Sequence, residues 1–281
     1  MQRDGGIILV NVLVALALGA ALVVLMFTSQ DNLIDRSRRM AAASQAEALA
    51  LGGEASIRAA LARDMTEAPD TDNRTEDWAR IQQETVALET GRFSVSVSDA
   101  QALFDINQFK DNGFASTQVL SLLIAQVGLP ARVTQSILTQ VQADGPLPDL
   151  DALRDMDAAT KVTLKTILVA LPAGGDVNLN TAPLPVIAAV IGNAATAGRL
   201  IALRDRKGLL TPDDLAAVGV VAVPGAGFTS DVFDVDVVAE VDDVTIALHS
   251  RLLRLHRTAT EREVRVIARR WGTASIAPDA E

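Results

Sequence analysis

Residues 6–27 read GIILVNVLVALALGAALVVLMF, and this stretch decides how the rest of the chain is placed. From Ile7 to Phe27 the one polar residue is Asn11. An α-helix rises about 1.5 Å per residue, so the segment covers roughly 30 Å, the thickness of the hydrocarbon core of a bilayer. The apolar run of a secretory signal peptide is shorter, about 7 to 15 residues, and ends at a small-residue cleavage site. The segment therefore predicts a membrane-spanning helix.

The charges that flank this segment do not settle its orientation. Arg3 precedes it, whereas Arg36, Arg38 and Arg39 follow it. Counted alone, these charges would place the amino terminus outside the cytoplasm. The rule is weak here, because a long domain follows and long domains translocate largely regardless of charge. The orientation therefore needs another argument.

The composition argues against several classes of function. The 281 residues are 49% hydrophobic, which is enough to bury a core, and they include no cysteine, so disulfides and thiolate metal clusters are excluded. His249 and His256 are the two histidines, and no ligand pair lies near either of them, which argues against zinc enzymes and histidine-based triads. A net charge of −10, 3% aromatic residues and the lack of tyrosine argue against general nucleic-acid binding.

The helical pattern continues beyond the apolar segment. One face carries apolar residues at multiples of four, namely Leu49, Ile57, Leu61 and Met65, and we expect this stripe to face a sheet. Gly52–Gly53 interrupts the pattern and Pro69 ends it. The two segments together predict one helix of about sixty residues, roughly 90 Å long.

Strand patterns occur in two places that lie far apart in the sequence. Residues 92–98 alternate apolar and polar side chains, and residues 103–107 are a second, short candidate strand. The alternation returns at 233–241, and residues 244–257 and 263–271 follow as a hairpin. We therefore predict one antiparallel sheet that is split in the sequence.

The residues between these strands, 113–227, predict a block of helices. Its expected helices are 116–127, 131–142, 150–171, 183–191, 195–205 and 212–218. Two helix starts are legible, because NTAP at 180–183 and TPDD at 211–214 each combine a capping side chain with proline in the first turn. The fold class is thus predicted to be α+β, and the tail to be disordered.

The start of the apolar segment resembles the class III signal of type IV pilins and pseudopilins. In that signal a glycine is followed by a pattern such as FTLIEVLVAL, and here Gly6 is followed by IILVNVLVAL. The resemblance implies that a prepilin peptidase cuts after Gly6 on the cytoplasmic side and methylates Ile7. It also supplies the orientation that the flanking charges leave open.

Asn11 stands where most members of that family have glutamate. A carboxylate inside hydrocarbon is costly unless it is paired, and in pilins its partner is taken to be the terminal amine of the neighbouring subunit. A subunit at the tip of a filament has no subunit above it, so a neutral residue fits a capping subunit. The alternative is that Asn11 is a tolerated polar residue.

A second resemblance lies in the helical block. It rests on VNLNTAP at 177–183, Ile191-Gly192, Arg199-Leu200-Ile201 with Arg204, and LTPDDL at 210–215. These motifs resemble the helix-hairpin-helix-like part of general secretion pathway protein K, a large minor pseudopilin of the type II secretion system. Residues 99–107 resemble the strand that enters its helical domain. Residues 142–150 lack the longer acidic loop of the family, so a calcium site in that loop is not carried over.

The resemblance implies an organisation for the whole chain. It predicts a cytoplasmic leader (1–6) and the transmembrane half of a pilin-like helix (7–27), followed by a periplasmic helix with the first strands (28–112). An inserted all-α domain with a SAM-like part (113–227), the remaining strands (228–271) and a tail (272–281) complete the chain. The chain would be a single-pass protein of the bacterial inner membrane with its carboxyl-terminal domain in the periplasm.

The resemblance also implies a function and partners. The chain would form part of the tip complex that initiates and caps the periplasmic pseudopilus, which exports proteins across the outer membrane. This role needs neither enzyme activity nor a cofactor. The implied partners are other minor pseudopilins, the major pseudopilin, the prepilin peptidase and the inner-membrane assembly platform.

The main alternative is a membrane-tethered DNA-binding or DNA-uptake protein that uses the helix-hairpin-helix-like block. Such units hold a phosphate with the backbone amides of a glycine-hydrophobic-glycine hairpin. The hairpin here reads Gly192-Asn193-Ala194, so its second glycine is missing. Residues 176–219 contain four basic and four acidic side chains, so their net charge is zero. Nucleic acid is therefore not an expected partner. A membrane-anchored hydrolase has no residue constellation behind it.

Several charged and aromatic residues receive simpler interpretations. The acids Asp70, Asp72, Glu76 and Asp77 offer oxygen ligands for calcium but fail the EF-hand pattern, because Arg74 occupies a ligand position; we interpret them as a solvated loop. The acids between 231 and 243 alternate with apolar residues and predict a wet sheet face. Arg199, Arg204 and Arg206 either pair with a neighbouring subunit or form a solvated helix face. Trp78 and Trp271 are expected to be packing anchors.

Overall fold

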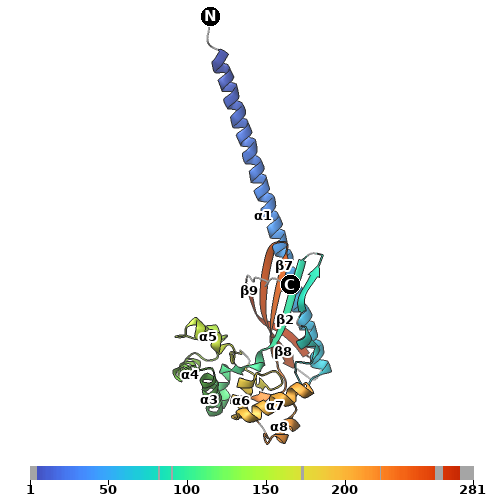
Figure 1. Cartoon of the computed structure of the whole chain (residues 1–281), viewed down its shortest axis with the longest axis vertical. Coiled ribbons are helices and arrows are strands. Elements are labelled where there is room, and N and C mark those ends of the chain that lie inside the picture. The colour runs from blue at the N-terminus through green and yellow to red at the C-terminus, as the bar shows by residue number, and fades with distance from the viewer. Residues whose placement is uncertain are drawn as a thin grey trace.

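The computed structural model describes residues 5–81, 83–89, 91–171, 174–221, 223–256 and 262–272. A long helix leads into a five-stranded antiparallel sheet, and a helical lobe lies at the end of the sheet that is far from the amino terminus (Figure 1). The predicted α+β class is confirmed: a long amino-terminal helix packs on an antiparallel sheet, and a helical part is inserted between the strands.

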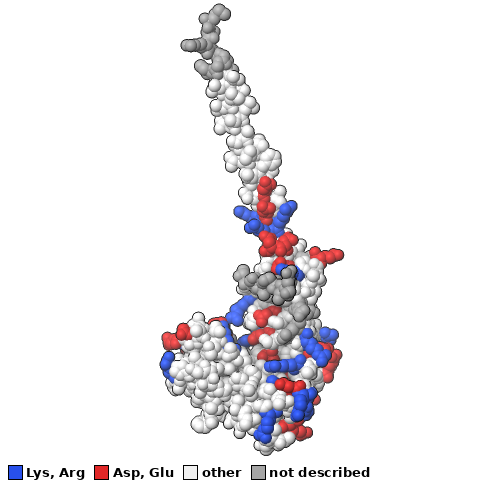
Figure 2. All heavy atoms as spheres, in the orientation of Figure 1, with Lys and Arg blue, Asp and Glu red and all other residues white. Residues whose placement is uncertain are grey.

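The first helix, α1 (Gly5–Glu67), is one continuous element of 63 residues. Its amino-terminal part is exposed, and by length and composition it can cross a membrane. Figure 2 shows this part as white spheres, with charged side chains beginning where the helix nears the sheet. The predicted single helix of about sixty residues is confirmed, and it continues through Gly52 and Gly53, where the apolar pattern is interrupted. Packing against the sheet outweighs the low helix propensity of glycine.

From Ala42 onward, one face of α1 is buried. Its fully or nearly fully buried apolar residues are Ala42, Ala46, Ala50, Ile57, Ala60, Leu61 and Met65. The spacing of about four residues places most of them on one side of the helix. Gly53 marks the closest approach, because a Cβ atom there would lie 3.0 Å from Val237 Cγ1 and 3.1 Å from Val95 Cγ2. Small side chains therefore allow the helix to lie close against the sheet.

The sheet consists of β1 (Gln83–Leu88), β2 (Gly91–Asp99), β7 (Val232–Val241), β8 (Val244–His256) and β9 (Arg262–Gly272), in that spatial order. All neighbouring strands are antiparallel. The central pair, β2 and β7, runs in register from Arg92↔Glu240 to Asp99↔Phe233, which confirms the predicted split sheet. The strand β1 was not predicted, since QETVAL has no clear alternation.

The sheet face opposite α1 carries ion pairs between neighbouring strands. Arg251 contacts both oxygens of Asp234 at 2.7 and 2.8 Å, and Arg92 contacts Glu240 at 2.9 Å. His249 Nδ1 lies 2.8 Å from Asp236, and this hydrogen bond raises the pKa of His249 despite its partial burial. Three of the acids predicted on a wet sheet face, Asp234, Asp236 and Glu240, therefore lie there in pairs with cations, whereas Asp242 and Asp243 lie in the turn between β7 and β8. The more exposed pairs, Arg92–Glu240 and His249–Asp236, add little stability, whereas the side chains of Arg251 and Asp234 are largely buried.

The helical lobe follows β2 and precedes β7 in the sequence. Its helices are α3 (Phe109–Gln126), α4 (Arg132–Asp144), α5 (Ala158–Leu164), α6 (Leu184–Ile191), α7 (Ala194–Lys207) and α8 (Pro212–Ala217), and a short α2 (Asp77–Arg80) precedes β1. Two small parallel pairs join β3 (Phe104–Asp105) to β4 (Leu168–Val169) and β5 (Val177–Asn178) to β6 (Ala226–Gly227). Three 3₁₀ turns complete it: η1 (Ala100–Ala102), η2 (Ile106–Gln108) and η3 (Leu150–Ala152).

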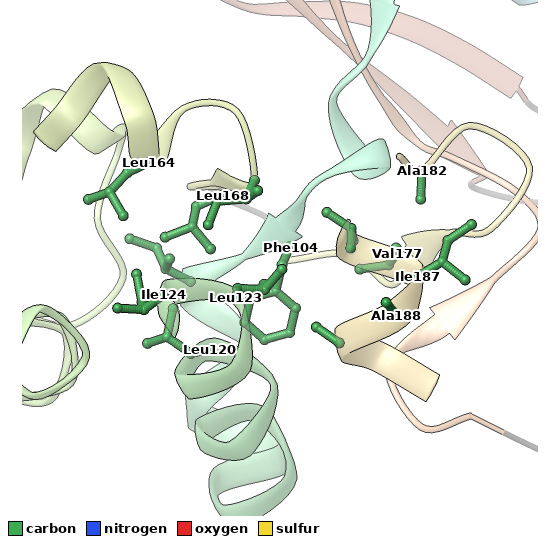
Figure 3. Close-up of a cluster of buried hydrophobic side chains, with 14 of the residues drawn as sticks. Phe104, Leu120, Leu123, Ile124, Leu164, Leu168, Val177, Ala182, Ile187 and Ala188 are labelled. Carbon is green, nitrogen blue, oxygen red and sulfur yellow. The ribbon is translucent and has the colours of Figure 1, made fainter. Parts of the chain in front are cut away.

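The lobe has a hydrophobic core of its own, separate from the core between α1 and the sheet. Figure 3 shows Phe104 near Leu120 and Leu123 of α3, with Val177 and Ile187 on the other side. These side chains are buried, so each contributes roughly 1.5–3 kcal/mol of transfer free energy. The lobe thus has its own core and is inserted between β2 and β7 in the sequence.

Two predictions within the lobe were wrong in detail. Residues 150–171 do not form one helix, because Asp155 takes a left-handed conformation with φ of 55° and Asp157 starts α5 by accepting a hydrogen bond from Thr160 N at 2.6 Å. The end of the segment pairs as β4 instead. The strand expected at 103–107 shrinks to β3, which pairs with β4 and not with the main sheet.

The two tryptophans differ in their surroundings. Trp78 is buried and meets Phe233 edge to face, with ring centroids 4.9 Å apart, as expected for a packing anchor. Trp271 is 45% exposed, so its prediction as an anchor was wrong. It lies near the end of β9 at an edge of the sheet, where few neighbours can cover a large ring. Gly272 still belongs to β9, and the rest of the predicted disordered tail, 273–281, lies outside the described residues.

The two adjacent glycines of α1 give a matched test of the close helix–sheet contact. We expect Gly53→Ala to lower the free energy of unfolding by about 1–3 kcal/mol, because its Cβ would overpack Val95 and Val237. At Gly52 no atom lies within 4 Å of the position that a Cβ would take. Gly52→Ala should therefore raise the free energy of unfolding by about 0.5–1 kcal/mol, because alanine has the higher helix propensity. Urea unfolding of the detergent-solubilised chain measures both, and equal effects would contradict the predicted contact.

Candidate functional site at the junction of sheet and lobe

Buried polar side chains gather where α1, the sheet and the helical lobe meet. The main members are Asp72 from the loop after α1, Asp99 at the end of β2, Asn178 in β5, Ser230 before β7 and Arg254 in β8, and all five are buried. Buried polar groups are costly unless they are hydrogen-bonded. Their partners therefore show what the junction holds together.

Asn178 is the centre of these contacts. Its side-chain Nδ2 lies 2.9 Å from each of three acceptors: the backbone oxygen of Asp72, Asp99 Oδ2 and Ser230 Oγ. Its side-chain oxygen accepts a hydrogen bond from Asn180 N at 2.9 Å. One side chain from the lobe thus contacts the loop after α1, the end of β2 and the segment before β7.

Asp99 is a hydrogen-bond acceptor in this group of buried polar side chains. Its carboxylate accepts hydrogen bonds from Ser230 Oγ at 2.6 Å, Thr181 Oγ1 at 2.5 Å and Gln101 N at 2.8 Å. Burial raises its pKa, and these hydrogen bonds act in the opposite direction. Among the described residues, the groups that donate to this carboxylate are neutral, so its position depends on their geometry.

Arg254 connects the end of α1 to the sheet. Its guanidinium contacts Asp64 Oδ2 at 2.6 Å and Asp72 Oδ1 at 2.5 Å. It also lies over the ring of Phe233, 4.5 Å from the centroid, in a cation–π contact. Breaking a buried ion pair by removing one partner leaves an uncompensated charge, which is strongly destabilising. Arg254 is therefore a structural residue of the junction.

The VNLNTAP motif is explained by these contacts and their neighbours. Asn180 Oδ1 accepts a hydrogen bond from Leu210 N at 2.6 Å, and Arg74 donates to the backbone oxygen of Thr181 at 2.6 Å. Arg204 donates to the backbone oxygens of Leu179 and Ala182 at 2.9 and 2.7 Å. The polar residues of the motif thus anchor backbone within the lobe and across the junction.

Arg204 corrects one sequence prediction. We expected it to pair with a neighbouring subunit or to lie on a solvated helix face, but it is 6% exposed and bonded within its own chain. Burial lowers its pKa, and the nearby Arg74 lowers it further. Its donors to Leu179 and Ala182 are not free for a DNA phosphate, and Arg199 contacts Thr196 at 3.1 Å. These contacts do not favour the DNA-binding alternative.

The acidic loop at 70–77 differs from a second sequence prediction, that of a solvated loop. Asp70 and Asp77 are exposed, whereas Asp72 is buried, so the loop is not solvated as a whole. Carboxylate oxygens of Asp64, Asp72 and Glu76 lie within 4.8 Å of one another and could hold a metal ion by distance. Two of these carboxylates already contact the Arg254 guanidinium. The arrangement is an ion-pair cluster, and by itself it does not establish a metal site.

The predicted processing residues lie elsewhere. Gly6 and Ile7 belong to the first turns of α1, and Asn11 is exposed on the same helix, at the end far from the junction (Figure 1). The junction residues Asp99, Ser230 and Arg254 were not singled out from the sequence. A signal existed for Arg254, because the alternation of β8 places it on the same side as the buried Leu248 and Leu252.

The fold and the junction define a pilin-like protein with an apolar amino-terminal helix and an inserted helical lobe. The sequence model of the family described as type II secretion system (T2SS), protein K matches residues 177–236. A chain in the crystal structure of the GspK–GspI–GspJ complex from the enterotoxigenic Escherichia coli type 2 secretion system has a similar fold, with a TM-score of 0.69. The sequence identity is 20%, and the similarity covers 85% of this chain and 100% of that chain. No curated protein matches this chain.

These findings confirm the resemblance to protein K of the type II secretion system that the sequence motifs predicted. The family match begins at Val177 and ends at Asp236, so it includes Asn178, Arg204 and Ser230 of the junction. The structural similarity, at this identity, concerns the fold. The segment that identifies the family is thus the one that attaches the lobe to the sheet.

The contacts of Asn178 predict a large cost for its truncation. We expect Asn178→Ala to lower the free energy of unfolding by about 1–3 kcal/mol, because Asp99 and Ser230 lose a buried partner. Asn32→Ala, an exposed asparagine on α1, should stay within about 0.5 kcal/mol of wild type. Urea unfolding of the full chain in detergent compares the two, and similar stabilities would contradict the role given to Asn178.

Proposed function

We propose that this chain is a minor pseudopilin of the type II secretion system and that it forms part of the tip complex that initiates and caps the periplasmic pseudopilus. The match of residues 177–236 to the protein K family carries this proposal. The fold supports it, since the lobe lies at the end of the molecule opposite the apolar helix (Figure 1). A bulky lobe at that end would leave no place for another subunit above it.

The proposed location follows from α1. Residues 7–27 would span the inner membrane once, and the sheet and the lobe would lie in the periplasm. The exposed apolar surface of this part of the helix supports the proposal, because bare apolar surface of this size needs lipid or another helix to cover it. The role is structural, without catalysis or a cofactor.

The proposed partners are the other minor pseudopilins. In the Escherichia coli structure GspK forms a complex with GspI and GspJ, and we propose that this chain assembles with the two corresponding proteins of its own system. The major pseudopilin, the prepilin peptidase and the inner-membrane assembly platform are further proposed partners. Between the span and the sheet, α1 exposes Leu33, Ile34 and Met40, which offer apolar surface for a partner helix.

Processing at the amino terminus tests the pseudopilin assignment. We expect the mature protein from membranes to start at a methylated Ile7 when the prepilin peptidase is active, because Gly6 and the following pattern resemble its recognition signal. Mass spectrometry of the amino-terminal peptide, in cells with and without the peptidase, measures this. An intact Met1 in both strains, or a start near residues 28–30, would indicate a plain anchor or an ordinary signal peptide and would overturn the assignment.

Association tests the tip assignment separately. We expect the full-length chain in detergent to co-purify with the two other minor pseudopilins, and Met40→Glu to weaken this association about tenfold or more, since burying one large apolar side chain contributes roughly 1.5–3 kcal/mol. Gln45→Glu introduces the same charge at an exposed polar position of α1 and serves as the control. A wild-type chain that fails to associate, while the other two bind each other, would refute a place in the tip complex.

A further inference from the structure

The loop that follows α1, residues 68–76, attaches this helix to the helical lobe through hydrogen bonds; we call this loop the strap. Asp72 N donates to the backbone oxygen of Phe228 at 2.8 Å, and Ser230 N donates to Asp72 Oδ2 at 2.7 Å. In return the backbone oxygen of Asp72 accepts from Asn178 at 2.9 Å. Asp72 thus makes three of the contacts that attach the strap to the lobe and to the segment before β7. Arg74, which donates to the backbone oxygen of Thr181 at 2.6 Å, and Thr71, which accepts from Asn180 Nδ2 at 3.2 Å, add two more.

The strap lies in a cluster with more acids than bases. Asp64, Asp72 and Glu76 place carboxylate oxygens within 4.8 Å of one another, and Arg254 is the cation that contacts Asp64 and Asp72. The hydrogen bonds of Glu76 come from neutral donors, Asn73 Nδ2 at 2.6 Å and Trp78 Nε1 at 2.7 Å. Three ionised carboxylates around one guanidinium would leave two excess negative charges in a largely buried place. Like charges at this distance disfavour full ionisation.

The surrounding charged groups do not remove this excess. Arg63 and Glu67 of α1 and Asp77 of α2 line the cleft beside Asp64 and Glu76, so they add one positive and two negative charges. On the sheet side, Asp99 of β2 is reached through Asn178 and Ser230. His256 of β8 and Asp231 lie 3.2 Å apart as a pair of their own, and Arg74 of the strap points to the backbone oxygen of Thr181.

We propose that the strap is fastened by a proton: it holds α1 to the lobe while one proton is shared among Asp64, Asp72 and Glu76, and it loosens when that proton leaves. A shared proton reduces the repulsion within the cluster and lets Asp72 keep its contacts with Ser230 and Arg254. Without the proton, the repulsion acts on Asp72, which makes three of the contacts that attach the strap to the lobe and to the segment before β7.

The titration of these groups places the change near neutral pH. Burial raises the pKa of Asp72 to about 7 and that of Glu76 to about 7, while Arg254 opposes the rise in both. Burial also raises the pKa of Asp64. The folded cluster therefore keeps its proton up to neutrality, whereas the unfolded chain loses it near the ordinary values of 3.8 and 4.5. Because the folded state binds more protons across this interval, stability falls as the pH rises through it and levels off above pH 7.

Hydrogen exchange of the full-length chain in detergent tests the proposal. Peptides that cover residues 68–76 are followed by mass spectrometry at pH 5.5 and pH 8.0, with rates corrected for intrinsic exchange and with a chelator present so that no metal ion replaces the proton. We expect protection of the strap to fall about tenfold or more at pH 8.0, since one pKa unit of displacement corresponds to a factor of ten. The strands β7 and β8 should keep their protection.

Two neighbouring acids supply the variants. Glu76→Gln mimics the protonated form, so it should preserve the protection of the strap at pH 8.0, whereas Asp77→Asn, at an exposed acid one residue away, should keep the wild-type pH dependence. Asp64→Asn is a second variant in case Glu76→Gln unfolds the loop. Equal protection of the wild-type strap at both pH values, or the same pH dependence in Glu76→Gln, Asp64→Asn and Asp77→Asn, would overturn the proposal.

Discussion

The close packing of α1 against one face of the sheet is the constraint on which the rest of the structure depends. The sheet buries Val95, Val235 and Val237 beneath this helix, and α1 approaches through alanines and Gly53. The same helix continues without a break into a segment that this sheet does not cover. One element thus links an apolar end suited to lipid with a folded domain, and a rigid helix is the means of doing so because its backbone hydrogen bonds are satisfied in both surroundings.

The lobe adds a second core that does not share side chains with the first. Two cores joined by short connections would be free to move relative to each other unless their boundary held them. Here the boundary combines polar contacts with a small apolar cluster of Ala100, Val169, Leu171 and Val232. Asn178, Asp99 and Ser230 link backbone and side chains from three separate segments, and Arg254 adds a charged link to the end of α1. Polar contacts of this kind specify one relative placement, since their geometry is satisfied in only one arrangement.

This organisation fits the proposed role at the end of a filament. A subunit that terminates assembly needs a lobe fixed in place above its helix, and a loosely tethered lobe would leave that position open. The family match over residues 177–236 covers the second part of the lobe and the start of β7, and not the apolar helix. The polar motif is therefore as informative about this protein as its amino-terminal signal, because it attaches the part that distinguishes it from a simple pilin-like subunit.

The sequence by itself determined many of the local elements and their order, although it missed β1 and the breaks within residues 150–171. Helical periodicity showed α1, and the alternation at 233–241 with the hairpin after it showed three strands. The capping pattern TPDD showed where α8 begins. These features depend on neighbours within a few residues. The cap predicted from NTAP was wrong, because the N-cap of α6 is Pro183 without a side-chain hydrogen bond, and Thr181 bonds to Asp99 instead. The motifs at Gly6 and at 177–183 indicated the family, and the processing role of Gly6, Ile7 and Asn11 stays a prediction.

Only the tertiary structure decided the junction. Asn178 meets Asp99 across 79 positions in the sequence and Arg254 meets Asp72 across 182, so no local pattern couples these residues. It also decided that Arg204 and Asp72 are buried, although both look like solvated charges in the sequence, and that residues 150–171 break into shorter elements. The physical reason is the same in each case: burial and charge pairing depend on which segments the fold brings together, and those partners lie far away along the chain.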